Sequence, residues 1–463
     1  MERNVPEQSH RDRKPEGRND HGDQRDHLAW EARPGADGAN GCGGGVDQDE
    51  PIFAPGRRTA VRVAVIGGGV AGLGAAYVLA RAHEVEVFER EPLAGGHANT
   101  VVHDGLSLDT GFLVHNEGTY PLLIRLFREL GVATQESEMS FSVSCADCGL
   151  EYSGRRPFAQ PRNAFDPRFY GLLGEIARWL RTALPALEQG DFEQASLQEY
   201  LDARGYSERF RHHFLVPLTS ALWSTAPGRA LEFPAATMIR FFDNHGMLGF
   251  RRLPWRTVTG GSRTYVDAIG ARLGTGLRTA AEVRSLRRDS DGVDVRTADG
   301  TMHRFDQVVI ATHADEALAL LEDPSDAERR ALGAFRYTVN ETVLHTDSSV
   351  LPRARAARAS WNYRMGENGA PTLTYYLNRL QQFESTTDYC VTLNQEIAPE
   401  HVLARFAYAH PLFTLETLAG QEALRALSGE RRTHYAGAHL GNGFHESGLA
   451  SGVAAAAAIG VSW

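Results

Sequence analysis

Lysine is almost missing from this sequence. Lys and Arg together number 48 among the 463 residues, yet Lys14 is the single lysine. We attribute most of the imbalance to genomic composition, because arginine also supplies a positive charge to a solvated surface. The absence still excludes any mechanism that needs a lysine amine within residues 15–463.

Cysteine is also scarce, and its four positions are Cys42, Cys145, Cys148 and Cys390. So few cysteines in a chain of this length exclude a disulfide-rich scaffold. Cys145 and Cys148 form one CxxC between two strand-like runs, whereas a zinc ribbon needs a second pair and a thioredoxin-type pair opens a helix. We therefore interpret the pair as small residues at a hairpin turn.

Long apolar runs and a surplus of basic residues are lacking as well. No run approaches the roughly 20 apolar residues of a membrane-spanning helix, and the alanine-rich segment 448–463 is too short. A net charge of −10 argues against nucleic acid as a partner. The composition, 42% hydrophobic and 23% charged, is typical of a soluble globular protein.

The N-terminal segment, residues 1–58, has mixed charge and almost no apolar periodicity. Such a segment cannot bury enough surface to offset the entropy of ordering it, so we expect a disordered tail. It has no apolar stretch of the kind found in a secretory signal. We expect a cytoplasmic protein, and peripheral contact with a membrane is left open.

The first informative pattern is a glycine-rich turn. Residues 61–66 are almost entirely apolar, as in a strand buried on both faces of a parallel sheet. Gly67, Gly69 and Gly72 follow in GxGxxG spacing, which permits a tight turn, approach of the backbone to a pyrophosphate, and close helix packing. A second strand ends at Glu89, whose carboxylate can accept hydrogen bonds from a ribose. Together these features predict a dinucleotide-binding unit.

The residues after Glu89 indicate which dinucleotide. The stretch EREPLAGGHANT contains Gly95, Gly96 and Thr100. It resembles the GGRxxT signature of the flavin-containing amine oxidases and phytoene desaturases, with His97 where that family usually has arginine. The resemblance implies FAD as the cofactor and implies that these residues contribute to its binding.

Two further stretches resemble the same superfamily. Asp109 and Gly111 resemble the D-x-G motif of this superfamily, which lies where the chain approaches the flavin a second time. Residues 282–312 alternate as strands joined by Asp-Gly turns and end in a buried strand. The resemblance implies that the backbone at Val283 contacts the adenine, and that VVIATHA closes the cofactor domain.

The C-terminal stretch HYAGAHLGNGFHESGLASG resembles the FAD motif of this superfamily, in which an Ala-Gly pair precedes a helix that points at the flavin. The dipole of that helix would stabilise negative charge on the reduced flavin. Ala438 stands where the superfamily usually has an acid, and we expect Glu446 to take over part of that role. No cysteine lies in the motif, so we expect FAD to be bound non-covalently. The resemblance assigns four residues of this stretch to cofactor binding: Gly437, Glu446, Gly448 and Leu449.

The resemblance is strongest to a bacterial group of predicted NAD/FAD-binding proteins related to the amine oxidases, through stretches such as FLVPLTSALWSTAP and GFHESG. It implies an α/β fold in which a Rossmann-type FAD-binding domain is interleaved with an α+β substrate domain. We expect the FAD-binding domain to comprise residues 59–118, 255–330 and 429–463, and the substrate domain to comprise residues 119–254 and 331–428. An amphipathic pattern over residues 165–184 predicts a helix that lies either in the core or on a membrane surface.

Four residues are candidates for the catalytic site. His439 and His445 lie in the C-terminal motif, and each could act as an acid or base or serve a structural hydrogen bond. Trp223 and Tyr376 are candidate walls of the substrate pocket, with an ordinary core position as the alternative.

The missing lysine also bears on the reaction. Many amine oxidases of this fold use a lysine-held water beside flavin N5, and this chain cannot. The sequence therefore favours an FAD-dependent oxidoreductase that transfers hydride between a largely apolar substrate, such as a lipid or acyl chain, and the flavin. An amine oxidase that releases hydrogen peroxide and a non-catalytic binding protein of the same fold remain alternatives, and the electron acceptor is open.

Overall fold

The computed structural model describes residues 60–190, 192–249, 253–366 and 371–463. Lys14, Cys42 and the whole of the predicted tail, residues 1–58, lie outside these residues, so the disorder of the tail stays a prediction. Within the described residues, no helix is long and apolar enough to cross a membrane.

A five-stranded parallel sheet contains the apolar run at residues 61–66. Its strand order is β10-β2-β1-β14-β20, with β1 (Arg62–Ile66) at the centre. Val63 and Val65 are fully buried, as expected for a strand covered on both faces. The predicted strand, glycine turn, helix and second strand are confirmed. The other strands are β2 (Glu84–Phe88), β10 (Leu277–Arg278), β14 (Gln307–Ile310) and β20 (Thr433–Tyr435).

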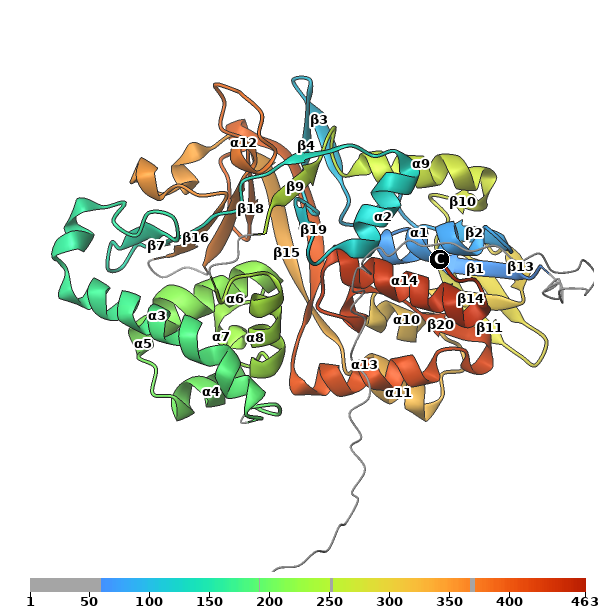
Figure 1. Ribbon diagram of the computed structural model, residues 1–463. Coiled ribbons are helices and arrows are strands. Elements are labelled where there is room, and N and C mark those ends of the chain that lie inside the picture. Colours follow the sequence, from blue (N-terminus) through green and yellow to red (C-terminus); the bar gives the residue numbers. More distant parts are fainter. Residues whose placement is uncertain (1–59, 191, 250–252, 367–370) are drawn as a thin grey trace, which may run out of the picture. The chain divides into compact units, whose positions relative to one another are not determined.

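Two helices from opposite ends of the described chain pack together beside this sheet. They are α1 (Val70–Leu79) and α14 (His445–Ile459), blue and red in Figure 1. A Cβ at Gly452 would lie 2.1 Å from the carbonyl oxygen of Ala71, so only glycine allows this approach. A Cβ at Gly448 would lie 2.8 Å from the side chain of Val70. The contact therefore places the first turns of the two helices side by side.

A three-stranded antiparallel sheet precedes β14. Its strands are joined by turns at Asp291-Gly292 and Asp299-Gly300, as predicted, and Gly300 has the positive φ of +86° that such a turn needs. The strands are β11 (Val283–Arg288), β12 (Val293–Thr297) and β13 (Met302–Phe305).

The second large sheet has seven strands in the order β19-β15-β18-β17-β16-β7-β8. Its pairings are antiparallel except for β16 with β7, which is parallel. The strands are β7 (Phe141–Cys145), β8 (Glu151–Ser153), β15 (Arg336–His345), β16 (Trp361–Met365), β17 (Thr372–Tyr376), β18 (Cys390–Leu393) and β19 (Val402–Leu412).

A helical layer (green in Figure 1) lies between β8 and β9 in the sequence. The predicted amphipathic helix is α3, and it buries Phe169, Leu172 and Trp179 in a hydrophobic core with the neighbouring helices. This burial supports the core position for its apolar stripe. The helices of the layer are α3 (Pro167–Glu188), α4 (Leu197–Ala203), α5 (Glu208–Phe210), α6 (Val216–Trp223), α7 (Pro227–Ala230) and α8 (Ala235–Asn244), with a π turn at Arg211–Leu215.

Smaller elements complete the described part of the chain. A two-stranded sheet pairs β3 with β4, and a three-stranded sheet has the order β5-β9-β6. The latter joins segments on both sides of the predicted domain boundaries, which stay a prediction. The remaining strands are β3 (Thr100–His103), β4 (Leu106–Asp109), β5 (His115–Asn116), β6 (Thr134–Glu136) and β9 (Trp255–Val258). The remaining helices are α2 (Pro121–Leu130), α9 (Arg263–Leu273), α10 (Ala314–Leu320), α11 (Asp326–Gly333), α12 (Leu377–Leu380) and α13 (Leu415–Leu427).

Candidate functional site

A cavity of about 1850 Å³ is lined by residues of both large sheets and by the first turns of α1 and α14. This volume exceeds the roughly 300–1,000 Å³ of a typical small-molecule pocket. The cavity therefore has room for a cofactor and a substrate together.

The glycine-rich turn forms one end of the cavity. Gly67 has φ of +103°, and a Cβ there would lie 2.8 Å from the carbonyl oxygen of Ala311. A Cβ at Gly72 would lie 1.9 Å from the carbonyl oxygen of Gly67, so the missing side chain lets α1 pack on the turn. Gly69 differs, because a Cβ there would meet no atom within 4 Å. Gly69 thus presents bare backbone to the open cavity, as approach to a pyrophosphate requires.

The second glycine pair docks on this turn. The backbone N–H of Gly95 donates to the carbonyl oxygen of Gly68 at 2.8 Å. Gly95 and Gly96 have φ of +126° and +55°, conformations that L side chains rarely adopt. Both glycines line the cavity next to His97. The pair therefore lets the chain fold back over the first turn without filling the space above it.

Glu89 also lines the cavity, at the end of β2. Its carboxylate accepts hydrogen bonds from the backbone N–H groups of Gly68 and Glu91, at 2.7 and 2.9 Å. These bonds hold the acid beside the turn, and each oxygen keeps a lone pair for another donor. Val283, at the start of β11, lines the same cavity.

The first turns of α1 and α14 both meet the cavity without a side-chain cap. The N-cap residues Gly69 and Phe444 make no capping hydrogen bond, and both line the cavity. The unpaired N–H groups of a helix end attract negative charge. Two such ends side by side suit a pyrophosphate at one helix and an electron-rich ring at the other.

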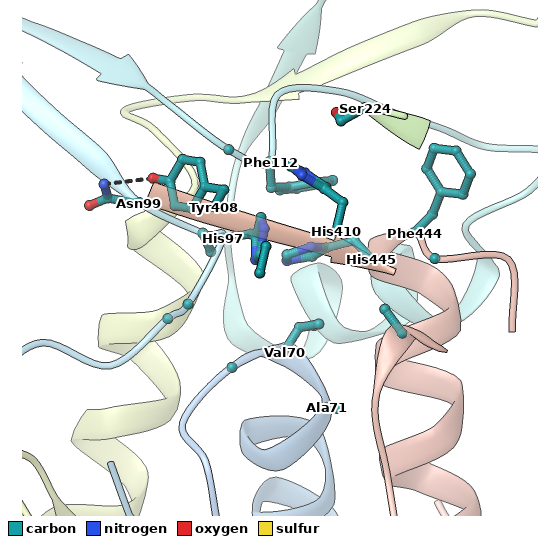
Figure 2. Close-up of a pocket in the computed structure, with 18 of the residues that line it drawn as sticks. Val70, Ala71, His97, Asn99, Phe112, Ser224, Tyr408, His410, Phe444 and His445 are labelled. Atoms are coloured by element: carbon teal, nitrogen blue, oxygen red, sulfur yellow. Dashed lines mark hydrogen bonds between the residues drawn. The ribbon is translucent and has the colours of Figure 1, made fainter. Parts of the chain in front are cut away.

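A cluster of polar aromatic side chains lies on the cavity wall between these helices and β19 (Figure 2). The ring of His97 lies 4.8 Å from that of Tyr408 and 5.2 Å from that of His410. Asn99 donates to the hydroxyl of Tyr408 at 2.9 Å. Burial, together with the nearby His313, lowers the pKa of His97 to about 4. At neutral pH His97 therefore carries no charge at the position where the superfamily usually has arginine.

The tautomer of His410 follows from its neighbours. The side-chain amide of Asn340 donates to His410 Nδ1 at 2.9 Å and to the carbonyl of Ser224 at 3.2 Å. The oxygen of Asn340 accepts from Asn394 at 2.7 Å, which fixes the orientation of the amide. His410 Nδ1 is thus an acceptor, and its proton lies on Nε2. Burial lowers the pKa of His410 to about 3, so the ring is neutral.

His445, the first residue of α14, is held on two sides. Its ring stacks on Phe112 with centroids 3.9 Å apart, and the hydroxyl of buried Tyr265 lies 2.7 Å from Nε2. Burial raises the pKa of Tyr265 and lowers that of His445 to about 3, so the tyrosine donates and the histidine accepts. This geometry favours a positioning role for a neutral ring over proton transfer to a substrate.

His439 lines the cavity beside Gly437. Its ring packs edge-on against Phe335 at 4.9 Å, and a Cβ at Gly437 would lie 2.3 Å from it. Burial, together with the nearby His313, lowers the pKa of His439 to about 3. A neutral ring packed in this way supports the turn that precedes α14.

Several residues selected from the sequence do not line the cavity. Thr100 donates to buried Asp109 at 2.6 Å and accepts from the backbone of Arg263 at the start of α9. Gly448 and Leu449 form the contact between α14 and α1. Both carboxylate oxygens of Glu446 accept backbone N–H groups in the first turn of α2. The structure therefore places these four residues behind the cavity wall, where they support it.

The two aromatic residues that the sequence suggested as pocket walls, Trp223 and Tyr376, also do not line the cavity. Trp223 is buried among other aromatic rings and donates to the carbonyl of Asn442 at 3.0 Å. Tyr376 donates to Asp388 at 2.6 Å, whereas Tyr375 lines the cavity. Side chains alternate between the two faces of a strand, so the prediction chose the neighbour of the lining residue. Trp361, opposite Tyr375 on β16, lines the cavity as well.

The end of the cavity remote from the glycine turns is largely apolar. Among the described residues there, Glu136 is the one carboxylate, and it is exposed. Cationic side chains on the same wall are Arg155 and Arg256. Representative apolar lining residues are Met139, Phe141, Leu218, Leu222, Phe241 and Trp361.

These features fit FAD. Gly69 leaves open space where a pyrophosphate would approach, and Glu89 is held beside it. Within the described residues, His97 Nε2 is buried at the wall and has no hydrogen-bond partner, as suits an atom that contacts a bound cofactor. Gly437, Ala438 and His439, which precede α14 in the sequence, line the same cavity.

Comparison with known proteins agrees with this geometry. The family described as flavin containing amine oxidoreductase matches residues 70–460. Proteins of two Mycobacterium tuberculosis strains, CDC 1551 / Oshkosh and H37Rv, are named "Putative flavin-containing monoamine oxidase AofH". Each is 27% identical to this chain over 277 residues, which are 57% of this chain and 59% of the relative. The chain thus spans less than two thirds of the length of these relatives.

Solved structures give the fold. Wild-type putrescine oxidase bound to putrescine matches with a TM-score of 0.64 at 15% identity, covering 86% of this chain and 99% of the oxidase. Cyclohexylamine oxidase from Brevibacterium oxydans IH-35A gives 0.63 at 17% identity, covering 86% and 98%. A fatty acid isomerase from P. acnes gives 0.62 at 16% identity, covering 85% and 97%. The expected fold class, a Rossmann-type FAD-binding part interleaved with an α+β part, is confirmed.

Proposed function

The chain belongs to the family of flavin containing amine oxidoreductases, which are FAD-binding enzymes, and on that premise we propose that its substrate is largely apolar, such as a lipid or acyl chain. The observation that carries this proposal is the wall remote from the glycine turns. It is built largely of aliphatic and aromatic side chains, and exposed Glu136 is the one carboxylate among its described residues. Burial of an acyl chain against such a wall contributes about 25 cal/mol per Å² of apolar surface.

Particular residues would hold the cofactor. The backbone at Gly67 and Gly69, with the first turn of α1, would bind the pyrophosphate, and Glu89 would accept from the ribose. Val283 would contact the adenine. The turn at Gly437 and the first turn of α14 would lie at the flavin ring. When bound, FAD supplies a hydride acceptor or donor at N5.

The chain's own residues would then exclude charge and water from the reacting carbon. His97, His410 and His445 are neutral at pH 7 because burial lowers their pKa values. Their rings, with Phe112 and Tyr408, form a wall without net charge beside the expected flavin position. Hydride transfer itself moves no proton and so needs no lysine there, in keeping with a sequence that has no lysine after Lys14. The second hydrogen that a desaturation removes would leave as a proton to solvent.

Arg155 and Arg256 give the apolar wall a cationic border. Arg256 is held by two hydrogen bonds to Thr134, at 2.8 and 2.7 Å. Arg155 is more than half exposed and lies 3.6 Å from Glu138. A substrate with an anionic head and an apolar tail matches this distribution, because an arginine can bind a carboxylate while the tail lies against the apolar residues.

Amine oxidation is the second candidate, because the named relatives and two of the solved structures are amine oxidases. It requires an amine at the same position. The cationic border would disfavour a protonated amine, and the missing lysine excludes a lysine-held water. These two features of the chain favour the acyl substrate.

A matched pair of substrates separates the two candidates. The flavin-loaded protein is incubated in air with stearic acid, linoleic acid, or stearylamine, which has the same chain length as stearic acid. We expect mass spectrometry and chromatography to show loss of two hydrogens, with oxygen as the final electron acceptor, or movement of a double bond, in an acyl substrate. Peroxide formed from stearylamine, with no change in either acid, would contradict the proposal. A Gly69→Val variant without flavin controls for non-enzymatic conversion.

A further inference from the structure

The CxxC pair lies in the turn of the β7–β8 hairpin, as the sequence predicted. Cys145 is the last residue of β7 and is buried, whereas Cys148 lies in the turn and is exposed. The two are not joined in a disulfide. The sequence offered no second pair, but the structure brings a histidine from a distant helix to the same place.

The turn directs both sulfur atoms to one side. The backbone N–H of Cys148 donates to the sulfur of Cys145 at 3.5 Å. Gly149 follows with φ of +69°, and the N–H of Cys145 closes the turn on the carbonyl of Leu150 at 2.8 Å. Burial raises the pKa of the Cys145 thiol, and this N–H hydrogen bond opposes the rise in part. The thiolate is the form that binds a metal ion.

His213 completes a group of three ligands. Its Nε2 lies 3.3 Å from the sulfur of Cys148. Its other ring nitrogen, Nδ1, lies 3.3 Å from the carbonyl oxygen of Arg209, so Nδ1 carries the proton and Nε2 keeps its lone pair. A metal-binding histidine almost always donates its second nitrogen in this way. The hydroxyl of Tyr152 on β8 donates to the backbone carbonyl of His213 at 2.5 Å and ties the histidine to the hairpin.

The local backbone at His213 is unusual. Residues Arg211–Leu215 form a π turn between α5 and α6. Such turns insert one residue into a helix and are frequent at functional sites. His213 is the residue of this turn that meets the two cysteines.

We propose that Cys145, Cys148 and His213 bind a zinc ion, with water as the fourth ligand. The three ligand atoms all lie within 4.8 Å of one another. A tetrahedral zinc site, with bonds of about 2.0–2.3 Å, places its ligand atoms about 3.5–3.8 Å apart, so small side-chain movements suffice. Two thiolates and an imidazole are ligands that zinc prefers. The thiol protons pass to solvent when the ion binds.

The zinc site would join two walls of the cavity. The β7–β8 hairpin and its approach supply Ser140, Phe141 and Arg155 to the lining, and α6 supplies Leu218 and Leu222. The ion would link the hairpin to the helix segment just before α6. We therefore expect zinc to stabilise the apolar end of the cavity without contacting the flavin.

The test uses the full-length, flavin-loaded protein, kept reduced, stripped with a chelator, and dialysed against zinc chloride. Elemental analysis should find about one zinc per chain. Cys148→Ser and His213→Ala should retain less than about a tenth of this. His212→Ala is the matched control, because His212 lies in the same π turn but is exposed and pairs with Glu208; this variant should bind zinc like the wild type.

Cobalt provides a readout on the unmodified protein, in case a variant does not fold. Co²⁺ added to the stripped wild type should give the thiolate charge-transfer and intense visible bands of a tetrahedral sulfur site, and zinc should remove them. The proposal is overturned if those bands do not form. It is also overturned if His213→Ala retains as much zinc as His212→Ala.

Discussion

Gly69 is the residue whose replacement tests the cofactor site most cleanly. Its φ is −76°, and a Cβ would enter open space, so Gly69→Val should fold without strain. The added side chain would occupy the space where a pyrophosphate must approach. We expect the FAD content of the purified protein to fall more than about tenfold, as measured by absorbance after heat release.

The same substitution at Gly228 is the matched control. Gly228 is exposed, and a Cβ there also meets no atom within 4 Å. Gly228→Val should keep full FAD content. A Gly69→Val protein that purified with a full complement of flavin would contradict the assignment of the glycine turn.

Glu446 gives a pH-dependent prediction. Burial raises its pKa to about 7, although the backbone N–H groups of Leu122 and Leu123 lower it in part. Because the folded pKa lies above the unfolded value near 4.5, the stabilisation is full below pH 4.5 and is lost as pH rises through about 7. The upper limit is about 3 kcal/mol, at 1.36 kcal/mol per pKa unit.

Glu446→Gln removes the titration while keeping one acceptor for the first turn of α2. As the pH rises from 5 to 8, the unfolding free energy of the wild type should therefore fall relative to that of Glu446→Gln. Chemical denaturation at several pH values measures this difference. A difference that did not change with pH would show that Glu446 does not titrate in this range.

At the scale of single residues, the sequence selected cavity-lining residues that lie close together in the chain. Gly67, Gly69 and Glu89 line the cavity and belong to one strand–turn–helix–strand unit, so a local pattern could point to them. Tyr408 and His410 come from β19, some 300 residues later, and no local pattern pointed to them. His213 was not selected for the same reason, because Cys145 and Cys148, which it meets, belong to a remote hairpin.

At the scale of elements, the contact between α1 and α14 depends on glycine. Alanine has the higher helix propensity, by about 1 kcal/mol, so Gly→Ala normally stabilises a helix. In Gly452→Ala the new methyl group would lie 2.1 Å from the carbonyl oxygen of Ala71. We expect a loss of about 1–3 kcal/mol from overpacking, which exceeds the gain in propensity.

A glycine-to-alanine substitution in α3 should stabilise the protein, whereas the one in α14 should destabilise it. Gly174 is exposed, and a Cβ there meets no atom within 4 Å. Gly174→Ala should stabilise the protein by about 0.5–1 kcal/mol. Thermal and denaturant unfolding of the two variants measure both values, and an equal effect of both changes would contradict the packing of α14 on α1.

The elements differ in how far the sequence predicted them. The buried strand β1 and the Asp-Gly hairpins of β11–β13 have strong local signals, and both are confirmed. Strand order in the seven-stranded sheet depends on pairings between distant segments, such as β7 with β16, which local periodicity does not encode. The sequence also did not determine which face of β17 is turned toward the cavity, so Tyr376 was selected, whereas Tyr375 lines the cavity.

At the scale of the whole molecule, buried histidines make the fold sensitive to acid. Eight histidines of the described residues have pKa values lowered to about 3 or 4 by burial. Each lowered pKa contributes stability that is full above pH 6.5 and is lost as pH falls toward 4, by up to about 3 kcal/mol. The residues are His97, His115, His245, His345, His410, His434, His439 and His445.

Two buried carboxyl groups act in the opposite direction, because burial raises the pKa of Asp109 to about 6 and that of Glu446 to about 7. They are outnumbered by the histidines, and a typical domain has only about 5–15 kcal/mol of stability. We therefore expect cooperative unfolding between pH 6 and 4. Circular dichroism against pH measures it, and a native spectrum at pH 4 would contradict the burial of these rings.

The central claim is that the cavity binds FAD beside an apolar substrate. It is tested most directly by the visible absorption spectrum of the purified protein, recorded without oxygen before and after addition of linoleic acid or stearylamine. The account predicts the bands of oxidised flavin, which the fatty acid bleaches or shifts and the amine leaves unchanged. A protein that is colourless and cannot be loaded with FAD, or a flavin that only the amine bleaches, would contradict it.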